Sequence, residues 1–308
     1  MDRFRLLQLP SLVLQAVLEF LDLFELFDLS QCSRKSFALI RLAGTEQYKL
    51  SLKNDRVVVN EKYRFETCRY SNMLQEKRSF FLTNGRKIFA QVGCHRENCN
   101  MRNFYFVNSN LGLQIILFHL AELFGCRIDS IDTGYPYLPS EIQRSIIGQI
   151  LNNLTITDYC VCAVETSPDF EYEFGTFPRK LFIRYSHWFK LNHLLDAAKS
   201  CVVIHLFESK LENKDIDVFM KLWASGDFPT LRYLKVGNMD FNQRDQILGR
   251  NPSQWLNNDR TVVREKIIID GKFIGRDNGV KFRRDDGIEA KIEMNWEAYE
   301  TYFRLYVL

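Results

Sequence analysis

Residues 9–44 read LPSLVLQAVLEFLDLFELFDLSQCSRKSFALIRLAG, and they decide how the N-terminal part of the chain folds. A second helix is expected from Asp22, because Asp22 and Glu25 have the spacing of a capping box. Ser33 is placed to cap a third helix, and Gly44 stands where a left-handed residue ends it. A first amphipathic helix is expected before these two. One of its faces is formed by Leu14, Val17, Leu18 and Leu21.

Three short helices of this size cannot bury a core alone. The stretch nevertheless has more apolar area than one stripe needs, contributed by Leu12, Val13, Phe20, Leu23, Phe24 and Phe27. Something must cover this excess. Either the helices dock onto the rest of the chain, or a partner protein interleaves its own helices with them.

The run from Leu6 to Ile40 resembles an F-box, the adaptor-binding module of cullin-based ubiquitin ligases. Where many F-boxes have Trp near the end of the motif, this chain has Ser36, as members of the nematode-type family often do. The resemblance implies that a Skp-family adaptor contacts the positions of the F-box pattern, which here are Leu9, Pro10, Val13, Leu14, Val17, Leu18, Leu21, Leu26, Leu29, Ser30 and Ser33.

The next part of the chain alternates strand-like runs with polar turns, and Asn84-Gly85 is a hairpin signal. The runs are Arg56 to Val59, Arg78 to Leu82, Lys87 to Val92 and Phe104 to Val107. From residue 111, helical and strand-like segments alternate. The expected helices cover 113–124, 139–150, 192–199 and 214–224, and the expected strands are CRIDSID, TITDYCVCAV, KLFIRY, CVVIHLF and LRYLKV.

This alternation favours a parallel sheet built from β-α-β crossovers. Strand starts 21 and 29 residues apart, at Leu181, Val202 and Leu231, are close to the unit length of leucine-rich repeats. We therefore expect an α/β (α+β overall) chain in which the three helices precede a repeat-like β-α domain, with a closed α/β sandwich as the rival. The dipeptides Asp270-Gly271 and Asp286-Gly287 predict antiparallel C-terminal hairpins.

The helix over 214–224 is the clearest, with Asn213 as its expected cap and an inner stripe that core packing explains. The region around it is similar to the type 2 F-box-associated domain. The matching positions are Trp188, Leu194, Leu195, Ser209 to Leu211, Phe219, Trp223 and Gly226. We thus divide the chain into an F-box (1–45), a β-rich connecting region (46–110) and an F-box-associated domain (111–308, best match 178–300).

The composition of the chain narrows the classes of function. Hydrophobic residues make up 46% of the 308 residues, and the net charge of the whole chain is only +3. Positive charge is concentrated in residues 49–102, which contain twelve Lys and Arg but five Asp and Glu. No nucleic-acid-binding signature accompanies that charge, so we expect no nucleic-acid partner. The sequence lacks a membrane-span pattern and a signal-peptide pattern, which predicts an intracellular protein, cytoplasmic or nuclear, whose cysteines are mostly buried thiols.

Sequence motifs for catalysis are missing. No P-loop, G-x-G-x-x-G, G-x-S-x-G or H-E-x-x-H occurs. Cys94, His95 and Cys99 form a small cluster, but a tetrahedral zinc site needs four ligands and no fourth lies nearby in the sequence. We expect no catalytic residue, no metal and no cofactor, so the chain is predicted not to be an enzyme.

Two hypotheses follow. In the first, the chain is the substrate-recognition subunit of a Skp-cullin-F-box ubiquitin ligase, which binds the adaptor through the F-box, a cullin through the adaptor, and an unknown target protein through its C-terminal domain. In the second, it is a non-catalytic interaction scaffold whose F-box-like helices pack internally.

Overall fold

The computed structural model divides into two compact units, Met1–Thr157 and Asp158–Leu308, which we describe separately. The domain boundaries predicted at residues 45 and 110 stay predictions. The residues that the structure describes are 6–53, 56–69, 78–81, 87–90, 92–94, 100–106, 109–133, 155–163, 165–167, 170–237, 242, 244–256, 266–276, 279–297 and 300–308.

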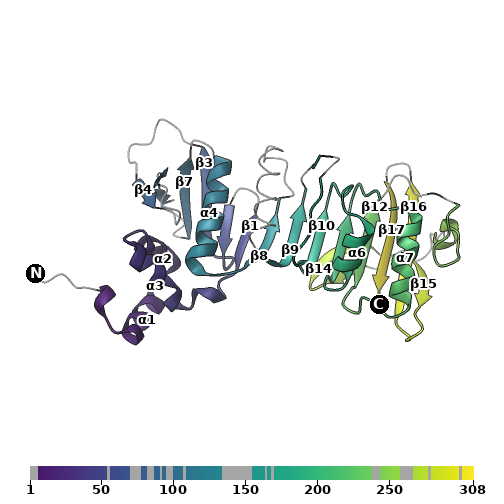
Figure 1. The fold of residues 1–308 in the computed structure, drawn as a ribbon, viewed down its shortest axis with the longest axis horizontal. Coiled ribbons are helices and arrows are strands. Elements are labelled where there is room, and N and C mark those ends of the chain that lie inside the picture. Colours follow the sequence, from purple (N-terminus) through teal and green to yellow (C-terminus); the bar gives the residue numbers. More distant parts are fainter. Residues whose placement is uncertain are drawn as a thin grey trace, which may run out of the picture. The chain divides into compact units, whose positions relative to one another are not determined.

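The first unit begins with the expected helices (Figure 1): a 3-10 turn η1 (Leu6–Gln8), α1 (Ser11–Phe20), α2 (Leu23–Ser30), α3 (Arg34–Leu39) and a 3-10 extension η2 (Ile40–Ala43). The predicted capping box is confirmed, because the Glu25 amide donates to Asp22 Oδ1 and the Asp22 amide to Glu25 Oε2, each at 2.8 Å. Ser33 caps α3 by accepting from the Ser36 amide at 3.0 Å, and Gly44 ends η2 with φ of 69°.

A mixed sheet and a long helix follow in the described part of the first unit. The strands are β1 (Leu50–Lys53), β2 (Arg56–Val59), β3 (Tyr63–Arg69), β6 (Val92–Cys94), β7 (Met101–Phe106) and β8 (Ile128–Asp132), in the order β8-β1-β2-β3-β7-β6. The β1–β8 and β3–β7 pairs are parallel, and the others are antiparallel. Helix α4 (Ser109–Phe124) packs on β3 and β7.

A separate antiparallel pair, β4 (Arg78–Phe81) and β5 (Lys87–Ala90), lies where the sequence predicted a hairpin. Its expected turn at Asn84-Gly85 lies outside the described residues, as do His95, Cys99 and the helix expected over 139–150. The sequence did not predict β1 and β3. In β1, three consecutive residues are buried, so its buried positions do not alternate with exposed ones.

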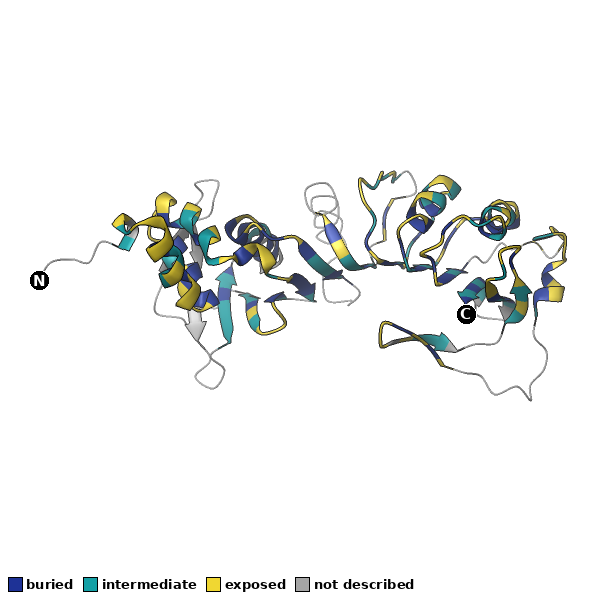
Figure 2. Cartoon of the chain, turned by 90° about the horizontal axis from the view of Figure 1, so that it is seen from below, coloured by how far each residue is buried: buried dark blue, intermediate teal, exposed yellow. Residues whose placement is uncertain are grey.

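The second unit begins with a parallel sheet whose strands follow one another in chain order. These are β9 (Ile156–Cys162, which begins at the unit boundary), β10 (Lys180–Ile183), β11 (Val203–Leu206) and β12 (Tyr233–Gly237). Neighbouring strands pair in parallel, as the β-α-β pattern predicts. Helices α6 (Leu191–Ala198) and α7 (Asn213–Ala224) form the crossovers and lie side by side on one face (Figures 1 and 2).

Three C-terminal strands extend this sheet in antiparallel fashion: β15 (Val280–Arg283), β16 (Glu289–Glu297) and β17 (Glu300–Val307), with β17 paired to β12. A hairpin of β13 (Lys266–Ile269) and β14 (Lys272–Arg276) packs Ile267 and Ile269 on Val203 and Tyr233. Its turn has positive φ at Asp270 (50°) and Gly271 (73°), the geometry that Asp-Gly predicts. The hairpin predicted at Asp286-Gly287 is also confirmed.

The core of the second unit confirms the predicted inner stripe of α7. Ile216, Phe219, Met220 and Trp223 are all fully buried. The predicted cap, however, is wrong. Asn213 is the first helical residue rather than the residue before it, and Glu212 takes the cap position. Asn213 is buried because its amide nitrogen donates to the carbonyls of Asn242 (2.7 Å) and Asp245 (2.9 Å), which fixes the loop after β12.

Candidate functional site

Helix α2 faces the interior of the first unit. Phe24 and Phe27 are buried, and their rings meet Phe65 of β3 at centroid distances of 5.3 and 5.5 Å. Phe27 also lies 5.8 Å from Phe104 of β7. These edge-on aromatic contacts are favourable beyond the area they bury. They fix α2 to the sheet, so this side of the helical module is already occupied within the chain.

Polar contacts strengthen the same junction. The Arg102 guanidinium donates to both carboxylate oxygens of Asp28, at 2.5 and 2.7 Å, while lying 4.6 Å from the centre of the Phe24 ring. Arg41 donates to the carbonyl of Glu122 at 2.7 Å, at the end of α4. Thr45, fully buried, donates to the carbonyl of Phe124 at 2.9 Å. The module is therefore held against β7 through α2, and against the end of α4 through η2 and Thr45.

His119 of α4 lies at the centre of this junction. Its ring is 5.7 Å from Phe27 and 5.6 Å from Phe37, and its Nε2 lies 3.2 Å from the side-chain nitrogen of Gln31. Burial lowers the pKa of His119 to about 4, because a charged imidazolium is poorly solvated there. The histidine is therefore neutral at physiological pH and packs as part of the core.

Helix α1 is different, because it is apolar on two sides and only one is covered. Leu14 and Leu18 are buried, and α1 packs against η2 on that side. Leu12, Val13 and Phe20 are 79%, 47% and 90% exposed. At 100° per residue these three fall on one side of the helix, and Figure 2 shows the N-terminal helices largely exposed on their outer surface. We call Leu12, Val13 and Phe20, with half-buried Leu9 and Val17 beside them, the α1 outer face.

The eleven positions expected to contact the adaptor differ in exposure. Pro10, Val13 and Ser33 are exposed. Those that are half-buried are Leu9, Val17, Leu21 and Leu29, and those that are buried are Leu14, Leu18, Leu26 and Ser30. The buried four support the fold of the free chain, and their direct contact with an adaptor stays a prediction.

Leu12 and Phe20 are not among the predicted contacts, although both are more exposed than Val13, which is. The signal was present in the sequence. Both fall outside the inner stripe of α1, and such a surplus of apolar residues on a short helix indicates a second covered side. Ser36, which stands where many F-boxes have Trp, is buried and donates to the carbonyl of Ser33 at 2.9 Å.

In the second unit, most residues that resemble the F-box-associated pattern belong to the core. Trp188, Leu194, Leu211, Phe219 and Trp223 are all at most 4% exposed. These residues specify the fold of the domain. Leu195 of α6, in contrast, is only half-buried.

The first unit thus contains a helical module that packs on its own sheet through α2 and keeps an open apolar face on α1. Comparison with protein families agrees: an F-box domain model matches residues 6–43, and a model described as F-box associated matches residues 175–236. The chain therefore carries an F-box domain at its N-terminus and an F-box-associated domain in its C-terminal half. No significant match was found among curated proteins or solved structures.

These two domains imply the ubiquitin ligase pathway, and an F-box implies binding to a Skp-type adaptor. F-box proteins are generally non-catalytic ligase subunits. Within the described ranges, no three His, Cys, Asp or Glu side chains are grouped to hold a metal ion. None of the described helices combines the length and apolar character that a membrane span requires.

Proposed function

We propose that this chain is the substrate-recognition subunit of a Skp-cullin-F-box ubiquitin ligase. The F-box binds a Skp-family adaptor and, through it, a cullin, while the F-box-associated domain binds the target protein. The chain itself does no bond chemistry. Holding a target beside the ubiquitin-charged enzyme raises the effective concentration of its lysines, which is the gain obtained by linking two binding modules.

The observation that carries this proposal is the α1 outer face. Phe20 and Leu12 are 90% and 79% exposed although the inner side of the same module is fully packed. Leaving such area in water is unfavourable, and exposed apolar patches of this kind mark protein-binding sites. We propose that the adaptor covers this face. It would contact Leu9, Pro10 and Val13, which are predicted contacts, and also Leu12 and Phe20, which are not.

The test is co-expression of the full chain with a Skp-family adaptor and purification through the chain. The double variant Leu12→Glu, Phe20→Glu should lose the adaptor, because both charges would be buried in the interface. The matched control is Phe273→Glu, an exposed aromatic residue (60%) of β14 in the second unit, which should retain the adaptor. Adaptor recovery by the double variant equal to the control would refute the proposal.

The scaffold alternative has one observation in its favour, the internal packing of α2 on Phe65 and Phe104. This packing accounts for the apolar residues of α2, but it does not account for the exposed apolar residues of α1. Hydrogen exchange of the chain with and without adaptor separates the two hypotheses. A receptor gains protection in α1 when the adaptor is added, with α2 protected throughout, whereas a scaffold shows the same exchange in both samples.

Two finer features belong to the same proposal. We place the protein inside the cell, in the cytoplasm or nucleus, because that is where the adaptor and cullin act. We also regard the regular alternation of β10, α6, β11, α7 and β12 as leucine-rich-repeat-like units. Repeat domains of this kind bind partners over an extended surface of the array.

A further inference from the structure

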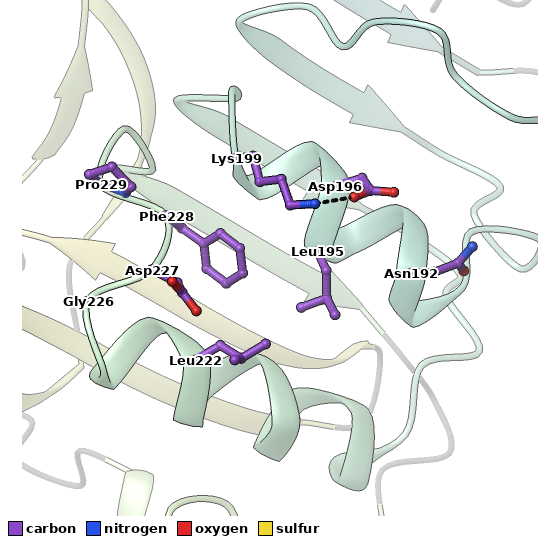
Figure 3. A pocket seen from close by; sticks show the side chains of 9 residues that line it. All are labelled: Asn192, Leu195, Asp196, Lys199, Leu222, Gly226, Asp227, Phe228 and Pro229. Carbon is purple, nitrogen blue, oxygen red and sulfur yellow. Dashed lines mark hydrogen bonds and ion pairs between the residues drawn. The ribbon is translucent and has the colours of Figure 1, made fainter.

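A groove of about 550 Å³ lies between α6 and α7 (Figure 3). Its volume falls in the range of sites that bind ligands or the anchoring side chains of peptides. All of its residues lie within the region matched by the F-box-associated model. It is lined by Asn192, Leu195, Asp196, Lys199, Leu222, Gly226, Asp227, Phe228 and Pro229.

The floor of the groove is apolar. Leu195 of α6 and Leu222 of α7 are half-buried, and their side chains lie between the two helices, where the Phe228 ring also lies (Figure 3). The Phe228 ring stacks on Phe219 at 5.3 Å with planes 2° apart, which fixes its orientation. Its backbone has φ of 62°, a conformation that is unfavourable for a bulky residue. The fold thus holds an aromatic ring in the groove despite a local cost.

The rim of the groove is acidic. Asp196 forms an ion pair with Lys199 at 2.6 Å, which neutralises that side. Asp227 makes no ion pair with any residue that the structure describes. Helices α6 and α7 both end at this rim, at Ala198 and Ala224, and helix C-termini carry partial negative charge. The electrostatic potential at the Asp227 end therefore favours a positively charged group.

We propose that this groove binds a segment of the target protein in which an apolar side chain, such as Leu, Met or Phe, lies next to Lys or Arg. The apolar side chain would enter between Leu195, Leu222 and Phe228, and the basic group would pair with Asp227. This inference rests on the proposed function, because it names the site through which the substrate receptor takes its target. A central anchor with a polar rim is the usual anatomy of such interfaces.

The test is selection of a random peptide library, displayed on phage, against the immobilised full-length chain. The selected peptides should share an apolar residue adjacent to Lys or Arg. Their affinity for purified variants is then measured by fluorescence polarisation. Leu222→Asp should weaken binding about tenfold or more, because it places a charge on the apolar floor. Asp227→Lys should weaken it severalfold and shift selection away from basic peptides.

The matched control is Val218→Asp. Val218 lies one turn before Leu222 on α7 and is 42% exposed, but it does not line the groove. This variant should bind the peptides like the unmodified chain, and equal thermal unfolding midpoints would show that all variants are folded. Peptides that lack the apolar-basic pair, affinity unaffected by Leu222→Asp, or no enriched peptide at all would each overturn the proposal.

The outcome is independent of adaptor binding. The α1 outer face belongs to the first unit and the groove to the second. If the unmodified chain recovers the adaptor but enriches no apolar-basic peptide, the groove proposal alone is refuted. If the unmodified chain binds such peptides but never recovers the adaptor, the ligase role alone is refuted.

Discussion

Replacing Phe20 by Ala should weaken adaptor binding without destabilising the chain. A phenylalanine side chain has roughly 200 Å² to bury, so at 90% exposure about 180 Å² of Phe20 is open to a partner. At about 25 cal/mol per Å², complete burial would contribute about 4.5 kcal/mol. Incomplete burial and lost rotamer freedom reduce this to about 2–3 kcal/mol, which is about 30- to 160-fold in Kd.

The assay is titration of immobilised full-length chain with purified Skp-family adaptor, together with urea unfolding of the chain alone. The unfolding midpoint of Phe20→Ala should equal that of the unmodified chain, since the side chain makes few contacts within it. Leu18→Ala should instead lower the unfolding midpoint. Leu18 is fully buried, and its truncation should cost about 2–5 kcal/mol of folding stability.

A third variant controls for the loss of an exposed aromatic ring as such. Phe273→Ala, on β14, should change neither adaptor affinity nor stability. An adaptor Kd for Phe20→Ala within about twofold of the unmodified value would refute the reasoning, because it would mean that the most exposed apolar side chain of α1 stays in water in the complex.

Three further predictions concern stability. Trp223→Ala should lower the unfolding free energy by about 3–5 kcal/mol in urea titrations, because this fully buried indole packs between Phe282 (6.1 Å) and the Arg284 guanidinium (5.1 Å). The unfolded chain protonates its histidines below about pH 6.5 while buried His119 resists until about pH 4. His119 should therefore lower the unfolding free energy by about 2 kcal/mol at pH 5, and the total fall should be smaller by that amount in His119→Leu. Asp270→Asn should cost about 1–2 kcal/mol, because Lys180 is 3% exposed and loses the nearer of its two carboxylate partners, leaving Asp158 at 3.8 Å; an unchanged urea midpoint would contradict this.

Local features of this fold could be predicted from the sequence because their causes lie within a few residues. The Asp22 and Glu25 capping box, the Ser33 cap and the Asp270-Gly271 turn each depend on a side chain and the backbone next to it. The buried stripe of α7 follows from helical spacing alone. Asn213 was misplaced by one position because its real partners, the carbonyls of Asn242 and Asp245, lie about thirty residues away.

The candidate site could be predicted only in part for the same reason. The sequence indicated a surplus of apolar residues in the N-terminal helices, but not which residues the chain itself would cover. That depends on Phe65, Phe104 and His119, which are distant in sequence and bury Phe27 rather than Phe20. The groove between α6 and α7 was also missed, because the pattern that includes Leu195 was interpreted as a fold signature.

The division of the helical module into a covered side and an open side bears on how tightly it can bind. A module of this length that had to fold on the adaptor would spend part of the interaction free energy on ordering its backbone. Here α2 is held by Phe65 and Phe104, and η2 by the contact of Arg41 with α4, before any adaptor arrives. The α1 outer face and the internal junction use different side chains, so covering the α1 outer face need not displace internal packing. Variants that loosen the junction without touching α1, such as Asp28→Ala, should therefore reduce adaptor affinity by raising the ordering cost, while the α1 outer face stays chemically unchanged.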